Sequence, residues 1–116
     1  MLIRVDPASE TPLFEQLATS IRQSVIDKSV AAGERLPGAR ELASSLGINM
    51  HTVLRAYQEL RDEGFIELRR GRGAIVAATT TSYDSLADGI TAVVAEARIH
   101  NVSLAALTSL IREEYK

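Results

Sequence analysis

The chain has 116 residues, 46% of them hydrophobic, with no cysteine and a net charge of −2, which allows one compact domain with a short appendage and excludes disulfides and thiolate-bound metals. No apolar run reaches about 18 residues and no signal segment opens the chain, so we expect a cytoplasmic protein without membrane contact. Between Arg35 and Arg72 there are seven arginines and five acidic residues, whereas residues 79–116 carry three basic and five acidic ones, a distribution that permits nucleic-acid binding without requiring it.

A short apolar segment precedes the first predicted helix. Residues 2–5 are expected to form a short strand or an arm lying on a partner. Thr11 and Pro12 predict the helix start, with Thr11 as the N-cap and Pro12 at the first helical position. The helix is expected to run to about Ser29, with an apolar face made by Leu13, Leu17, Ile21 and Val25. Residues 35–36 then predict another short strand.

The segment 36–64 has the spacing of a helix-turn-helix. The apolar stripe of its first helix consists of Leu42, Ala43 and Leu46. Gly47 follows that helix at a place where a positive φ is wanted, and Asn49 can cap the next helix by accepting a hydrogen bond from an amide two or three residues later. The second helix is expected over 50–63 and ends at Gly64. Its inner face consists of Val53, Tyr57 and Leu60.

A basic hairpin follows the two helices. Residues 65–68 and 74–77 predict its strands, and residues 69–73 its tip. The order of elements is typical of a winged helix-turn-helix, whose second helix enters the major groove of DNA and whose hairpin is the wing. The fold is therefore expected to be mainly α, with a small antiparallel β-hairpin.

Two helices are predicted after a linker at 78–82, the first ending near His100 and the second capped by Ser103. Such short helices need a partner surface, which folding back on the first helix or pairing across a two-fold axis would supply. Pairing is favoured, because two recognition helices about 34 Å apart can read a palindromic site. We thus expect a DNA-binding domain at 1–78 and a dimerisation tail at 79–116. The expected homodimer contacts are Leu86, Ile90, Val93, Leu104, Leu107, Leu110 and Ile111.

The block from Leu36 to Gly73, LPGARELASSLGINMHTVLRAYQELRDEGFIELRRGRG, resembles the DNA-binding domain of GntR-family bacterial transcription regulators. The preceding TPLFEQLATSIRQSVIDKSVAAGERLPG is similar to the same family, so that the resemblance covers about residues 10–78. The short tail and the phrase TVLRAY at 52–57 are similar to the YtrA-like subgroup. This resemblance implies a dimeric repressor that binds a palindromic operator in double-stranded DNA, with some such regulators controlling transporter operons. A small-molecule effector is left open.

The resemblance also implies which residues contact DNA. They are Arg40, Met50, His51, Thr52, Arg55, Arg70, Gly71 and Arg72. Asn49 is added because the first turn of a recognition helix projects into the groove. Many family members have arginine where this chain has Met50 and Leu54, so this chain need not recognise the operator sequence that those members recognise. Met50 could instead contact a thymine methyl, and His51 could donate to a purine N7.

Each basic residue also has an ordinary structural explanation. Arg40 could pair with Glu41 or Asp62, Arg55 could pair with Glu59, and His51 could simply be solvated. The arginines of residues 69–72 could belong to an ordinary exposed hairpin tip.

Two other functions are weaker alternatives. A winged helix that acts as a protein-interaction module, without specific DNA binding, is compatible with the net charge of −2. An enzyme is not expected, because His51 and His100 lack metal-ligand spacing and neither a phosphate-binding loop nor a Ser–His–acid set is recognisable. No cofactor and no metal are therefore expected.

Overall fold

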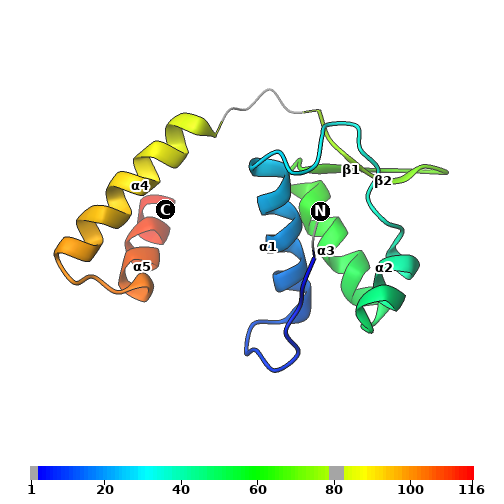
Figure 1. The fold of residues 1–116 in the computed structure, drawn as a ribbon, viewed down its shortest axis with the longest axis horizontal. Coiled ribbons are helices and arrows are strands. Elements are labelled where there is room, and N and C mark those ends of the chain that lie inside the picture. The colour runs from blue at the N-terminus through cyan, green and yellow to red at the C-terminus, as the bar shows by residue number, and fades with distance from the viewer. Residues whose placement is uncertain (1–2, 79–82) are drawn as a thin grey trace. The chain divides into compact units, whose positions relative to one another are not determined.

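The computed structural model describes residues 3–78 and 83–116. The chain divides into two compact units, Met1–Thr80 and Thr81–Lys116, referred to below as the first and second units. The elements of the first unit are α1 (Leu13–Ile26), α2 (Ala39–Leu46), α3 (Met50–Asp62), β1 (Ile66–Arg69) and β2 (Gly73–Val76) (Figure 1). Those of the second unit are α4 (Asp84–Ile99) and α5 (Leu104–Glu114). The mainly α fold with one antiparallel hairpin is confirmed.

The residues before α1 lie against their own chain. Ile3 and Val5 are half-buried and pack on the core of the first unit. The predicted strand at 2–5 is wrong for residues 3–5, which have no regular structure, and residue 2 lies outside the described residues. The Gln16 side chain fixes this segment, since its oxygen accepts from the Asp6 amide at 2.7 Å and its nitrogen donates to the Asp6 carbonyl at 3.0 Å.

Both ends of α1 differ from their predicted positions. The N-cap is Pro12 and makes no side-chain capping bond, so the expected Thr11 cap is wrong. The Gln16 side chain also donates to the Thr11 carbonyl at 2.8 Å and so ties the preceding segment to the first turn of α1. At the other end the helix stops at Ile26, before the expected Ser29. Lys28 follows with a φ of 64°, a left-handed conformation that does not continue a helix.

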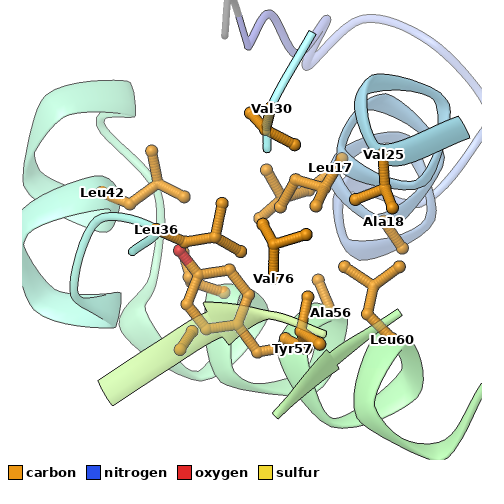
Figure 2. Packing of buried hydrophobic residues seen from close by; sticks show 14 of the residues in the cluster. Leu17, Ala18, Val25, Val30, Leu36, Leu42, Ala56, Tyr57, Leu60 and Val76 are labelled. Atoms are coloured by element: carbon orange, nitrogen blue, oxygen red, sulfur yellow. The ribbon is translucent and has the colours of Figure 1, made fainter. Parts of the chain in front are cut away.

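One hydrophobic core unites the three helices and the hairpin of the first unit (Figure 2). Leu17, Ile21, Val53 and Leu60 each have 0% exposure, and full burial of such a side chain stabilises a fold by about 1.5–3 kcal/mol. The predicted inner faces of α1 and α3 are therefore the faces that pack together.

The chain between α1 and α2 joins the base of the wing. Strands β1 and β2 pair in antiparallel fashion, with Ile66 opposite Val76 and Arg69 opposite Gly73. The predicted strand at 35–36 is a single bridge between Arg35 and Ile75, reinforced by the Leu36 amide, which donates to the Ala74 carbonyl at 2.8 Å. This bridge fixes the hairpin relative to the start of α2.

Tyr57 links α3 to the turn before α2. Its side chain is buried, and its hydroxyl donates to the Pro37 carbonyl at 2.6 Å. Burial raises the pKa of Tyr57 to about 12, and the negative charge of Glu41 contributes to the same shift. The neutral phenol is therefore the form that the fold requires.

Substitution Tyr57→Phe is expected to lower the free energy of unfolding by about 1–3 kcal/mol, because it leaves the Pro37 carbonyl without its donor.

The pKa of Tyr57 is higher in the fold than its ordinary value of 10.0. The stabilisation that this shift represents is complete below pH 10.0 and is lost as the pH rises towards 12. Urea denaturation at about pH 8 and about pH 11 would measure this effect. Between these two pH values the free energy of unfolding should fall more for the wild type than for Tyr57→Phe. Equal losses would contradict this role of Tyr57.

The second unit is a helical hairpin with most of its apolar surface exposed. Helix α4 ends at Ile99 with His100 as its C-cap, as expected. The Ser103 hydroxyl accepts from the Ala106 amide at 3.1 Å, which confirms the predicted cap of α5. Ala97 is the one buried residue among the described residues of this unit.

Two further expectations concern the connection and the membrane. Within the predicted linker at 78–82, residue 78 has no regular structure and residues 79–82 lie outside the described residues. None of the helices in the described ranges has the length and hydropathy of a bilayer-spanning segment.

Candidate nucleic-acid interface

The turn between α2 and α3 has the geometry that the sequence predicts. Gly47 adopts a left-handed conformation with a φ of 68°. The Asn49 side chain accepts a hydrogen bond from the His51 amide at 2.8 Å, which confirms it as the N-cap of α3. The Ile48 amide donates to the Ala43 carbonyl at 3.0 Å and Ile48 packs on the core. These contacts fix the position of the start of α3 relative to α2.

Helix α3 has one buried and one exposed face. Val53, Ala56, Tyr57 and Leu60 form the buried face. His51, Arg55 and Gln58 are exposed, and their spacing places them on the opposite side of the helix. Thr52 and Leu54 are half-buried beside this exposed strip, whereas Met50 is half-buried and packs on the core. Of the side chains in the first turn of α3, His51 is thus the most accessible to a ligand.

Arg55 contacts a residue of α1 that the sequence did not indicate. Its guanidinium carbon lies 3.7 Å from the centroid of the Phe14 ring. A cation over an aromatic ring at this distance is attracted by about 0.5–1 kcal/mol at an exposed site. No ion pair joins Arg55 to Glu59 in the parts of the chain that the structure describes. Arg55 therefore connects the exposed strip of α3 to α1.

Ion pairs divide the arginines of the first unit into two groups. Arg22 pairs with Glu63 at 2.6 Å, Arg61 with Asp62 at 3.2 Å and Arg69 with Glu67 at 2.6 Å. Among residues 3–78 the other arginines are exposed and have no ion-pair partner. This unpaired group consists of Arg4, Arg35, Arg40, Arg55, Arg70 and Arg72. The alternative pairing of Arg40 with Glu41 or Asp62 is therefore not observed.

The wing tip presents two of the unpaired arginines. Residues 70–72 form a turn in which the Arg72 amide donates to the Arg69 carbonyl at 3.1 Å. Gly71 has a φ of 79°, which suits glycine and leaves the backbone of the tip uncovered by a side chain. Arg70 and Arg72 flank this glycine and are both exposed.

Arg35 is a further candidate that the sequence interpretation missed. A Cβ atom placed on Gly73 would lie 3.9 Å from both Nε and Nη2 of Arg35. The Arg35 guanidinium therefore lies beside the second strand of the wing and adds a third unpaired positive charge to it. The predicted strand at 35–36, if paired with the wing, was the signal that could have identified this residue.

These features define a winged helix-turn-helix in which His51 is exposed in the first turn of the second helix, Arg55 is exposed one turn later, and the wing tip is exposed and basic. No group of three or more metal-binding side chains occurs in the described part of the chain. Residues 13–76 match the family described as "Bacterial regulatory proteins, gntR family", and the chain belongs to this GntR family of transcription regulators.

Several relatives resemble the chain closely. It is 40% identical over 76 residues to the HTH-type transcriptional repressor YtrA of Bacillus subtilis, a match that covers 66% of this chain but 58% of the repressor. It is 32% identical over 100 residues to the HTH-type transcriptional regulator YhcF of the same organism, covering 86% of this chain and 83% of YhcF. Both of these relatives are named as HTH-type regulators of transcription.

Solved structures give the same result. YtrA from Sulfolobus acidocaldarius, a GntR-family transcription factor, has a TM-score of 0.63 and 33% identity, with 97% of this chain and 96% of that one covered. The DNA-binding domain of AraR in complex with operator ORX1 has a TM-score of 0.56 and 25% identity, with coverage of 64% and 92%. One of the solved structures to which this chain is similar is therefore a DNA-binding domain in complex with an operator.

Proposed function

We propose that the protein is a sequence-specific, dimeric repressor that binds a palindromic operator in double-stranded DNA. The first turn of α3 enters the major groove, and the wing tip approaches the adjacent minor groove. The side chains assigned to this surface are Arg40, Asn49, Met50, His51, Thr52, Arg55, Arg70, Gly71 and Arg72.

The unpaired arginines are the observation that carries this proposal. Arg40 stands at the start of α2, and Arg70 and Arg72 stand at the wing tip, without acidic partners among the described residues. Other arginines of the same unit are neutralised by neighbouring carboxylates. An unpaired guanidinium is well suited to phosphate and to guanine edges, and the N-terminal end of α3 has a helix dipole that favours a nearby anion. The net charge of −2 is therefore compatible with a locally basic reading surface.

The exposed apolar side chains of the second unit support a homodimer. Leu86, Ile90 and Val93 of α4 are 60%, 52% and 45% exposed, and Leu104 and Leu110 of α5 are 80% and 61% exposed. A groove of about 420 Å³ lies within this unit, lined mainly by apolar residues that include Val93, Leu107 and Leu110. A second copy would cover these surfaces and would place two winged helices on one duplex.

Selection of bound duplexes from random DNA by the purified protein tests the proposal. The expected product is an inverted repeat whose half-sites are centred about one helical turn, or a multiple of it, apart. Fluorescence anisotropy on the selected duplex should then show an affinity that falls steeply with salt concentration. Absence of any enriched sequence would favour the alternative of a protein-interaction module.

A further inference from the structure

A shallow apolar groove lies between α3, the start of α2 and the tip half of the wing. It has a volume of about 300 Å³, and its lining includes Leu54 and Tyr57 of α3 together with Leu68 and Arg70 of the hairpin. The Tyr57 hydroxyl is already donated to the Pro37 carbonyl. The α3 side of the groove therefore offers an apolar surface whose one hydroxyl has already used its donor, and the cationic side chain of Arg70 lies at the wing side.

Leu68 is unusual in the first unit. It is 38% exposed, and among the described residues of this unit it is the one leucine, isoleucine or valine that is exposed. Leu54 is half-buried and lies one turn beyond His51, next to the exposed strip of α3. Leu54 and Leu68 thus leave apolar surface accessible to solvent on this side of the first unit.

The position of the groove indicates what could occupy it. Leu54 follows His51 by three residues, so the groove continues the α3 surface assigned to the major groove. Arg70 at its wing side favours an anionic partner. A ligand that fits both features is anionic and carries a small apolar projection. In the major groove of DNA, the C5-methyl of thymine is the apolar group that the base edges present.

We propose that Leu54, extended by Leu68, recognises a thymine methyl group in each half-site of the operator. This inference rests on the proposed function and adds a base preference to it. Leucine has no donor or acceptor, so it cannot select guanine as an arginine at the same position would. Met50, for which the sequence also suggests a thymine contact, packs partly on the core instead. The residue of α3 that we expect to contact the thymine methyl is therefore Leu54 in the second turn of the helix.

Substitution of deoxyuridine for thymine tests this contact without changing any hydrogen bond of the base pair. The probe is the duplex that the wild-type protein selects from random DNA, with each thymine replaced in turn. Loss of one buried methyl should weaken wild-type binding about fourfold at the contacted position. Thymines outside the inverted repeat serve as controls and should show no change.

Protein variants then locate the contact. Leu54→Ala should bind the thymine and deoxyuridine duplexes equally, and Leu54→Met, which keeps an apolar side chain, should retain a preference for thymine. Equal wild-type affinity for every substituted duplex would overturn the inference and leave the proposed function intact. A preference that persists in Leu54→Ala and disappears in Met50→Ala would also overturn it. Failure to select any duplex would instead overturn the proposed function itself.

Discussion

The double substitution Val93→Asp and Leu110→Asp is expected to convert the protein to a monomer. Its affinity for the palindromic duplex should then fall about 100-fold or more, because two DNA-binding units that are no longer linked bind their half-sites separately. Val93 and Leu110 are 45% and 61% exposed and line the same apolar groove of the second unit. Charged carboxylates on this surface would oppose burial by a second copy. Sedimentation at micromolar concentration and anisotropy titrations would measure the two effects.

The matched control for this experiment is Ile99→Asp. Ile99 is 73% exposed, and its position in α4 places it on the side of the helix opposite Ile90 and Val93. This variant should remain a dimer and bind the duplex as the wild type does. A monomeric wild type, or a monomeric double variant with unchanged DNA affinity, would contradict the role assigned to the second unit.

Substitution of Arg40 or Arg72 with alanine is expected to weaken DNA binding by about 1–3 kcal/mol if the side chain contacts a base. If it contacts a phosphate, the affinity should fall for all sequences, and the slope of log affinity against log salt should become shallower by about one unit for each phosphate that is no longer neutralised. Both arginines are exposed and lack ion-pair partners in the described ranges. Anisotropy titrations of the selected duplex at several salt concentrations distinguish the two cases.

Arg69→Ala provides the comparison for the wing. Arg69 precedes the tip, and its guanidinium is held by Glu67 at 2.6 Å. Because its charge is already compensated, its removal should change the affinity less than the removal of Arg72. Unchanged affinity in both Arg40→Ala and Arg72→Ala would contradict the assignment of these two arginines to the DNA-binding surface.

The features that the sequence predicted well are those set by neighbouring residues. Asn49 and Ser103 cap their helices because a short polar side chain reaches amides two or three residues away. Gly47 ends α2 because its left-handed conformation suits glycine. Apolar spacing likewise identified the buried face of α3. Local rules were sufficient for all of these.

The features that it did not predict depend on residues far apart in the chain. Arg55 lies over Phe14, which comes 41 positions earlier, and no local rule indicates that partner. The Gln16 side chain binds the backbone of Asp6 and Thr11, 10 and 5 positions earlier, and the capping rules do not indicate these bonds. Arg35 joins the wing through a bridge to Ile75. No local pattern places Leu54 and Leu68 in one groove either, since that depends on how the hairpin packs beside α3.

Affinity cleavage from position 51 tests the central claim most directly, namely that the first turn of α3 lies in the major groove. The chain contains no cysteine, so His51→Cys creates a single attachment point for an iron chelate. Strand cleavage of the selected duplex should be concentrated inside each half-site, whereas the same chelate on Arg72→Cys should cleave at the flanks. Intact binding without localised cleavage from position 51 would contradict this placement of α3.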